Sequence, residues 1–428
     1  MTSKPKFSGN RAFAICRYLT QSIGERVQGL ESTITTKDYL AQQLLDYGLE
    51  KVHAEAFPVF TSRQRKAQVT TRKHTFEGLS FGLSGSTPME GITGSIATYT
   101  SWSWKPTPDT LSSFSDKIVV LYTRDFSQQV VQDLIQAGVR GIVYVTYHPG
   151  IPPHLPMAFL YYALKTGDFD LLPPVVSVNY RDGAHLLTTG REATIHTNVT
   201  ILQSESYNII GEIPGQEPDT ILFSAHYDSA PYSPGAADNA SGTAILLELA
   251  RILANFTPRW TLRFIACGSE ECALQGAHHY CQQHSTQLEE IKLNLNYDVQ
   301  GARNGNLAMG ILGDKRLRTQ IGRSIAEWNP EIRQGPTGGD NRVFAHYGIP
   351  AVHWWFGGGI NFLLNHTPHD RIGNIAPYSL ELVGRAAHTL VKELNQERTL
   401  RYSIPKTQQT NNSHTLPSIS PQTQRSRN

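Results

Sequence analysis

The fold is decided by residues 220–253, which read TILFSAHYDSAPYSPGAADNASGTAILLELARIL. The apolar run Thr220–Ala225 is typical of a buried strand, and Ala240–Asn255 repeats large aliphatic residues every three or four positions, as an amphipathic helix does. Polar residues fill the connection between them. A strand, a polar loop and a helix in this order predict an α/β unit whose chemistry lies at the carboxyl end of the strand.

The same alternation continues downstream. Further strands are expected at Trp260–Ala266, Ile291–Tyr297 and Ile349–Trp354, with helical segments between them. Strands and helices that alternate in this way predict an α/β fold with a mostly parallel central sheet, flanked by helices on both faces.

Residues 10–48 predict two helices that belong to the same fold. The first carries apolar residues at spacings of four, four, four and three, namely Ile15, Leu19, Ile23, Val27 and Leu30. The second begins at Thr35 or Thr36, either of which can cap a helix, and ends at Gly48.

Between about 88 and 200 the chain has a separate strand–helix–strand rhythm. Strands are expected at Lys117–Tyr122, Gly141–Thr146 and Val175–Val178, and a helix at Ser127–Ala137. No cluster of His, Asp, Glu or Cys at ligand spacing occurs there. We therefore expect a smaller, non-catalytic α/β domain that is inserted after the Gly/Ser-rich stretch Gly78–Thr87.

The expected organisation has four parts. They are the N-terminal part of the catalytic domain (1–85), the inserted domain (86–203), the main catalytic domain (204–402) and a tail (403–428). The tail is rich in Ser, Thr, Gln, Asn and Pro, and it has too few apolar residues to form a core. It is therefore expected to be disordered.

Composition excludes several classes of protein. Lys and Arg number 38 against 36 Asp and Glu in 428 residues, so no nucleic-acid partner is expected. The four cysteines contain no Cys-x-x-Cys pair, which argues against a thiolate zinc ribbon. No apolar run is long enough to span a membrane. The N-terminus has no apolar stretch beyond the short Ala12–Cys16, so no signal peptide is visible. As written, the chain is expected to be cytoplasmic; a truncated N-terminus would leave a secreted or periplasmic location open.

Side chains with metal-ligand chemistry follow directly after the expected strands. They are His226 and Asp228 after the first strand, Asp238 before the helix, Glu270 and Glu271, Asp298, and His366 and His369 near the C-terminal end. Carboxylates cannot crowd at one sheet edge without a compensating cation. Imidazole and carboxylate suit zinc, and a shared carboxylate suits two ions about 3.5–4 Å apart. The residues alone do not choose between His366 and His369.

Other candidates have a simpler structural interpretation. Cys267 and Cys272, with Cys281 nearby, can be read as thiolate ligands or a disulfide, but buried packing is more typical of such positions. His278, His279 and His284 are more typical of a solvated helix face. The aromatic residues Trp354, Trp355, Phe356 and Phe362 fit either a substrate pocket or the core.

The ordered set of motifs resembles one family. His226-x-Asp228, Gly-Ala-x-Asp238-Asn-x-Ser-Gly, Glu270-Glu271, Asn-Tyr-Asp298 and His366-Thr-x-x-Asp370 resemble the co-catalytic di-zinc exopeptidases of the leucyl-type aminopeptidase and glutamate carboxypeptidase kind. The resemblance implies a zinc exopeptidase (phosphorylase/hydrolase-like) fold. The segment 88–200 resembles the protease-associated (PA) domain that is often inserted in such enzymes.

The resemblance also implies roles for the residues. His226 and Asp298 would hold one zinc ion, Glu271 and His366 the other, and Asp238 would bridge both. Glu270 would be the general base that takes a proton from the metal-bridging water, and Asp228 would orient His226. The implied protein is a hydrolase that contains two zinc ions and removes N-terminal residues from peptide substrates, with a PA-like domain that contacts the substrate or a protein partner.

Three alternatives remain open: a glutaminyl cyclase-like enzyme with one zinc, a carboxypeptidase-type enzyme, and a non-catalytic receptor-like module on the same fold. The sequence departs from the family pattern at two places. Gly339-Asp340-Asn341 stands where members often have Ser-Asp-His, and Asn365 stands where several have Tyr.

Overall fold

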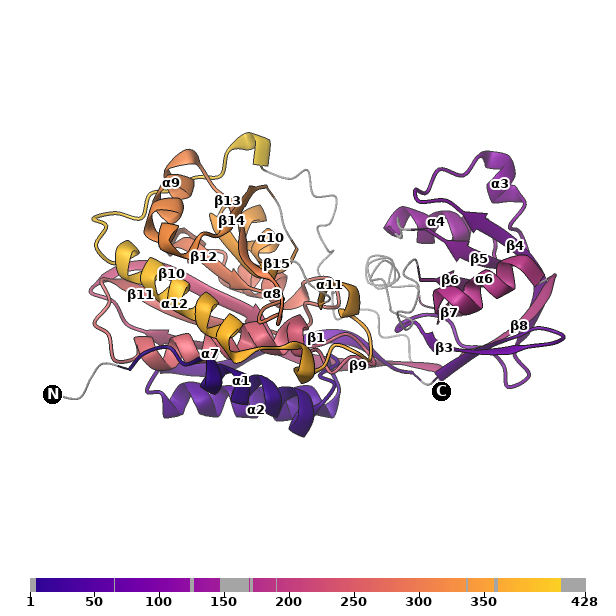
Figure 1. Cartoon of the computed structure of the whole chain (residues 1–428), viewed down its shortest axis with the longest axis horizontal. Helices are drawn as coiled ribbons and strands as arrows, with labels where there is room; N and C mark the ends of the chain where they lie inside the picture. Colours follow the sequence, from indigo (N-terminus) through magenta and orange to yellow (C-terminus); the bar gives the residue numbers. More distant parts are fainter. Residues whose placement is uncertain are drawn as a thin grey trace. The chain divides into compact units, whose positions relative to one another are not determined.

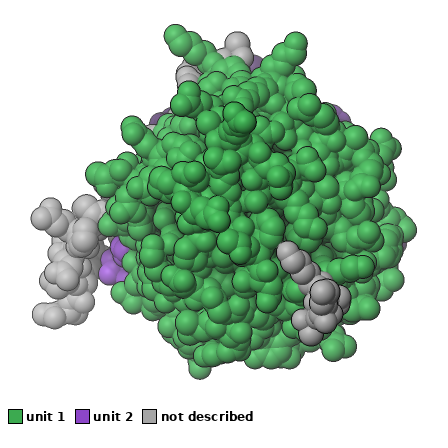
Figure 2. All heavy atoms as spheres, turned by 90° about the vertical axis from the view of Figure 1, so that its left-hand side faces the viewer, with its two compact units in different colours: residues 1–57, 205–414 green, residues 58–204, 415–428 purple. Residues whose placement is uncertain are grey.

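The chain forms two compact units. The structure is a computed structural model that describes residues 5–64, 66–123, 127–146, 169, 172–189, 191–335, 338–357 and 361–408. Unit 1 contains Met1–Phe57 and Glu205–His414, and unit 2 contains Pro58–Ser204 and Thr415–Asn428 (Figure 2); the helices and strands are labelled in Figure 1. Unit 1 is therefore built from both ends of the chain.

An eight-stranded sheet forms the centre of unit 1. Its order is β1 (Glu50–Gln64), β9 (Val199–Ile213), β11 (Trp260–Cys267), β10 (Glu217–His226), β12 (Ile291–Tyr297), β15 (Ala351–Gly357), β13 (Asn306–Leu312) and β14 (Glu331–Gln334). The four central strands β11, β10, β12 and β15 are parallel. β9 and β13 pair with them in the antiparallel sense. The carboxyl ends of the central strands therefore meet at one edge.

Helices cover both faces of this sheet. They are α1 (Gly9–Arg17), α2 (Glu31–Asp46), α7 (Ser241–Leu253), α8 (Gln275–Gln283), α9 (Lys315–Ser324), α10 (Asn341–His346), α11 (Asn361–Leu364) and α12 (Pro377–Leu394). Alternate strand residues point to opposite faces. Phe223 and Phe264 pack in the core shared with α1, α7 and α12, whereas Leu222 and Ile265 pack in the core shared with α8 and α10. The predicted α/β fold is confirmed.

The N-terminal helices differ from the expected ones. The first helix ends in a π-helical turn, Tyr18–Ile23, and does not continue to Leu30. Gly24, at φ 90°, takes the chain out of the helix in a conformation that favours glycine. The second helix begins at Glu31, before Thr35 and Thr36, and Thr36 donates to the carbonyl of Ser32 inside the first turns. The periodic apolar pattern from Ile15 to Leu30 therefore continues past the residue, Gly24, at which the helix ends.

Unit 2 is a closed barrel with helices packed on it. The strand order is β2 (Lys66–Thr70), β3 (Thr75–Ser80), β7 (Val175–Val178), β6 (Gly141–Val145), β5 (Ile118–Tyr122), β4 (Ile92–Thr100) and β8 (Glu192–His196). Its helices are α3 (Pro108–Ser112), α4 (Gln128–Gln136) and α6 (Tyr180–Thr189). β4, β5, β6 and β7 form successive parallel pairs.

The first boundary of unit 2 lies at Pro58, earlier than the expected residue 86. The reason is that β2 and β3, which precede the Gly/Ser-rich stretch, pair with β8 and β7 of the barrel. Gly78 belongs to β3, where a Cβ atom would lie 2.4 Å from the carbonyl oxygen of Ser177. This glycine allows close backbone packing within the barrel.

The beginning of the expected tail is packed against unit 1. The backbone N–H of Ser403 donates to Asp314 Oδ2 at 2.9 Å, and Gly313 N–H donates to Gln408 Oε1 at 2.9 Å. Residues 403–408 therefore cover the start of α9, and the rest of the expected tail lies outside the described residues. No helix in the described ranges is long and apolar enough to cross a membrane.

We expect Gly384→Ala to destabilise the contact of α12 with the N-terminal segment. A Cβ at residue 384 would lie 2.2 Å from the ring of buried Phe7, so the ring must move and the free energy of unfolding should fall by about 1–3 kcal/mol. Gly322→Ala in α9 is the matched control, because its nearest neighbour would be Ile332 at 3.7 Å. Urea denaturation measures both; equal stability of parent and Gly384→Ala would contradict the prediction.

Candidate metal centre

Seven side chains from different elements meet at the carboxyl edge of the central sheet. His226 is the last residue of β10, Asp298 follows β12, and Glu270 and Glu271 follow β11 after a short turn. Asp238 lies in the π-helical turn η2 (Ala236–Ala240) before α7. The two remaining side chains are Asp228, two residues after β10, and His366, two residues after α11. The structure thus brings together the seven site residues that the family resemblance implied, and His369, the other histidine that the sequence offered, is not among the grouped donors.

Asp238 lies between the two imidazoles. Its Oδ1 is 3.1 Å from His226 Nε2, and its Oδ2 is 3.2 Å from His366 Nε2. Burial acts to raise the pKa of Asp238, but its hydrogen bonds with His226 and His366 outweigh this and lower the pKa well below its ordinary value. One carboxylate therefore offers one oxygen to each histidine, as a carboxylate that bridges two ions does.

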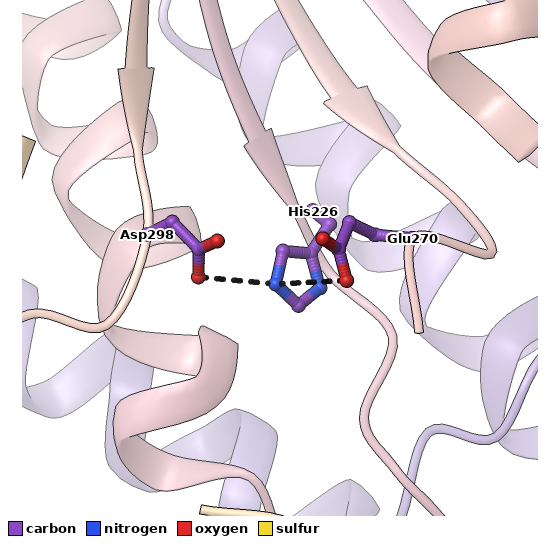
Figure 3. A group of neighbouring side chains, drawn as sticks. All are labelled: His226, Glu270 and Asp298. Atoms are coloured by element: carbon purple, nitrogen blue, oxygen red, sulfur yellow. Dashed lines mark hydrogen bonds and ion pairs between the residues drawn. The ribbon is translucent and has the colours of Figure 1, made fainter. Parts of the chain in front are cut away.

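Each imidazole also faces a second carboxylate. His226 Nε2 is 3.2 Å from Asp298 Oδ1, and His366 Nε2 is 3.0 Å from Glu271 Oε2. Ligand atoms from His226, Glu270 and Asp298 form one compact group, and those from Asp238, Glu271 and His366 form another. Figure 3 shows Asp298 and Glu270 on opposite sides of the His226 ring.

These distances fit zinc. Nitrogen and oxygen ligands at about 2.0–2.2 Å from one tetrahedral ion lie about 3.3 Å from each other. The separations of 3.0–3.2 Å between the imidazole and carboxylate atoms are close to that value. The donor set of imidazole and carboxylate is also the one that zinc accepts.

Glu270 lies slightly further from the cluster than the other carboxylates. Its Oε2 is 3.8 Å from His226 Nε2. Burial raises the pKa of Glu270 well above its usual range; His226 lowers it, and Asp298 and Glu271 raise it further. A largely buried carboxylate at this distance from the proposed ligands is placed to accept a proton.

Asp228 binds the backbone of the glutamate pair and faces the imidazole of His226. It accepts the backbone N–H of Glu270 and of Glu271, each at 3.1 Å, with one carboxylate oxygen for each. Its Oδ1 is also 3.5 Å from His226 Nδ1. Asp228 therefore sets the turn that presents Glu270 and Glu271 as well as facing the imidazole, a wider role than the one implied by the motif.

Asp370 holds the segment that carries Asp238. Its two carboxylate oxygens accept the backbone N–H of Ala237 at 2.8 Å and of Asp238 at 3.0 Å. Burial raises the pKa of Asp370 to about 7, against the lowering effect of these two hydrogen bonds. Asp370 stands in the motif His366-Thr-x-x-Asp370, and its position four residues after His366 is the signal in the sequence for this role.

The competing candidates are not among the grouped donor side chains of the described structure. Cys267, Cys272 and Cys281 are buried free thiols, as is Cys16. His284 pairs with Glu55 at 2.5 Å, and Phe57 stacks on His279. Trp354 and Phe356 are part of the core, and the side chain of Phe362 lies outside the described part. Asp340 is buried beside the site, and burial raises its pKa to about 7 although His226 lowers it.

We expect His366→Ala to lose metal and His369→Ala to keep it. His366 Nε2 faces Asp238 and Glu271, whereas the contacts of His369 in the described structure are backbone ones, to Thr367 and Asn374. Removal of a ligand should release the ion at that position, and elemental analysis of each purified variant measures it. Metal loss in His369→Ala alone would reverse the assignment.

The mostly parallel sheet and the paired donor groups at the carboxyl edge of its central strands are those expected of a zinc exopeptidase, which is a metallopeptidase and a hydrolase. Residues 208–391 match the model of peptidase family M28. The predictions of the family, the fold class and the enzyme class are thereby confirmed.

Similar proteins cover most of the chain. The sequence is 27% identical to aminopeptidase YwaD of Bacillus subtilis (strain 168) over 92% of this chain and 88% of that protein. It is 26% identical to carboxypeptidase Q of Homo sapiens over 68% of this chain and 65% of that protein. The crystal structure of BSAP, a zinc aminopeptidase from Bacillus subtilis, has a TM-score of 0.77 at 23% identity and covers 93% of this chain and 97% of its own. The last likeness concerns the fold.

Proposed function

We propose that this protein is a zinc-dependent aminopeptidase that uses two zinc ions to hydrolyse the N-terminal residue of peptides. The observation that carries the proposal is the position of Asp238, with one oxygen toward His226 and the other toward His366. The relatives support it, because proteins similar over nearly the whole chain are named as an aminopeptidase and a zinc aminopeptidase.

The chain's own residues would divide the chemistry between them. His226 and Asp298 would hold one ion, Glu271 and His366 the other, and Asp238 both. Bound zinc would polarise the scissile carbonyl and make a water molecule more acidic. Glu270 would accept a proton from the attacking water and pass it to the leaving amine. The buried carboxylates around the site would also favour the ammonium group of a free N-terminus.

We further propose that unit 2 is a PA-like domain that contacts the peptide or a protein partner. The support is its order of elements, in which β5, α4 and β6 and then β7 and α6 follow the pattern that gave the resemblance. None of the proposed ligands belongs to unit 2. Metal binding is therefore expected to depend on unit 1 alone.

A substrate panel tests the proposed activity. We expect release of the N-terminal residue from free-amine peptides, loss of that activity with a chelator, and recovery with zinc. N-acetylated peptides of the same sequence are the control for the free amine, and C-terminally amidated ones test the carboxypeptidase alternative that carboxypeptidase Q raises. Cyclisation of N-terminal glutamine with a single zinc would favour the glutaminyl cyclase alternative. No turnover with no metal would favour the receptor-like one.

A further inference from the structure

Arg26 is a fully buried cation that the proposed chemistry does not use. Its side chain is 0% exposed. Nε donates to the carbonyl of Tyr227 at 2.7 Å, and Nη2 donates to the carbonyl of Gly235 at 2.9 Å. Nη1 donates to the carbonyls of Gly24 at 2.7 Å, Pro234 at 2.8 Å and Leu19 at 3.3 Å. Within the described structure, every hydrogen bond of this guanidinium goes to a backbone carbonyl. Buried charges usually pair directly with an opposite charge, so this arrangement calls for an explanation.

Three of the five carbonyls that Arg26 binds, those of Tyr227, Pro234 and Gly235, belong to the two segments that present metal-ligand side chains. Tyr227 lies between His226 and Asp228, and Pro234 and Gly235 lead into Asp238. One planar group therefore ties the end of β10 to the segment before α7. Its fork geometry holds both segments at fixed separations, which a point charge cannot do.

The backbone around Arg26 continues the same contact. Arg26 N–H donates to Ser229 Oγ at 3.0 Å, and Ser229 N–H donates to the carbonyl of Arg26 at 3.3 Å. The N–H of Tyr232 donates to Glu25 Oε2 at 3.1 Å. On the other side of this loop, Ala230 N–H donates to Glu271 Oε1 at 3.1 Å. The loop 227–235 thus links the N-terminal segment to a proposed ligand.

Gly235 shows how closely the guanidinium fits. It lies at φ 59°, and a Cβ there would be 2.9 Å from Arg26 Nη2 and 2.5 Å from Ser229 Cβ. The positive charge of Arg26 also contributes to the electrostatics of the site, because it interacts with the negative charges of Asp228, Asp238 and Asp370. A fixed cation next to these buried carboxylates lowers the cost of holding them together in the absence of metal.

We propose that Arg26 is the positioning residue of the metal centre: by binding the carbonyls of Tyr227, Pro234 and Gly235, it holds the segments of His226 and Asp238 in the arrangement that binds the ions. The inference rests on the proposed function, because it concerns the same metal site. It makes residues 19–26, which lie outside the family match at 208–391, part of the centre.

The test compares Arg26→Lys with Arg263→Lys. Lysine keeps the charge of Arg26 but cannot reach the carbonyls on both segments at once. Arg263 is the matched control, because it is a largely buried arginine of the same unit that binds Glu212 at 2.6 Å and the Tyr280 hydroxyl at 2.7 Å, away from the ligand segments. The affinity for zinc is measured by competition with a chromophoric chelator, and the melting temperature of each metal-free protein is measured alongside.

We expect the zinc dissociation constant of Arg26→Lys to rise about 10–100-fold, as for other residues that orient ligands, with kcat reduced more than KM is raised. Arg263→Lys should bind zinc as the parent does, even if its melting temperature falls equally. In Arg26→Ala, millimolar methylguanidinium should restore part of the zinc affinity. Parent-like affinity in Arg26→Lys would overturn the inference. A parent that binds no zinc would instead reject the proposed function.

A measurement on the parent protein decides the matter if neither Arg26 variant folds. Zinc should slow hydrogen–deuterium exchange of the amides at 19–30, although no ligand lies there, because the ligand segments and Arg26 share hydrogen bonds. Unchanged exchange in this segment, with slowed exchange at 226–238, would show that the N-terminal segment is not coupled to the metal centre.

Discussion

Glu270→Gln is expected to lower kcat by about 10²–10⁴ while the protein keeps both zinc ions and binds substrate with similar affinity. Glutamine has the size and shape of glutamate but cannot accept a proton. Glu270 lies 3.8 Å from His226 Nε2, further than Asp298 and Asp238, so its loss should leave the ligand contacts in place. The measurements are steady-state kinetics and elemental analysis on the same preparation.

The adjacent glutamate supplies the matched control. Glu271 Oε2 is 3.0 Å from His366 Nε2, so Glu271→Gln should weaken binding of one ion and lose activity that added zinc partly restores. Added zinc should not restore the activity of Glu270→Gln. Because Glu270 also falls within the compact ligand group of His226 and Asp298, the comparison separates a base from a ligand. A metal-depleted Glu270→Gln with a metal-replete, slow Glu271→Gln would exchange the two roles.

Asp238→Ala is expected to remove both zinc ions and to lower activity at least as much as Glu270→Gln, by about 10⁴ or more. No other carboxylate in the described structure has its two oxygens 3.1 Å from His226 and 3.2 Å from His366. A ligand that stabilises the folded state raises the melting temperature. A chelator should therefore lower the melting temperature of the parent but leave that of Asp238→Ala unchanged.

Asp219→Ala is the control for this second prediction. Asp219 is an aspartate at the opposite end of β10 from His226, where it pairs with Lys292 at 3.5 Å. The Asp219→Ala variant should keep two zinc ions, and a chelator should lower its melting temperature as it does for the parent. If Asp238→Ala retains one ion, Asp238 is a terminal ligand of a single metal; if it retains both, the bridging role is wrong.

Much of the fold was predictable because parallel strands place their chemistry at one edge. The strand Ile291–Tyr297 has the expected bounds, and the polar residues after β10, β11 and β12 meet as their positions indicated. The sequence signal was strong because a buried strand appears as a continuous apolar run, and each run here ends abruptly at a polar side chain with metal-ligand chemistry. The sequence therefore carried both the sheet and the residues at its edge.

Other features had no comparable signal. The break at Gly24 was hidden because the apolar spacing continued through it to Val27 and Leu30. The earlier start of unit 2 depends on the pairing of β2 with β8, a contact between distant segments. Arg26 binds backbone carbonyls, which every residue has, so its partners leave no mark in the sequence. Contacts of this kind appear only when the chain is seen folded.

The construction of unit 1 from both ends of the chain has a consequence for biosynthesis. Gly9 N–H donates to Glu381 Oε2 at 3.4 Å, so the first helix packs on the last one, and His366 is supplied late in the sequence. On the ribosome, residues 58–204 of unit 2 form one stretch of chain that can fold while α1 and α2 still wait for their partners. The proposed centre, whose ligand side chains run from His226 to His366, is then expected to assemble only after His366 has emerged.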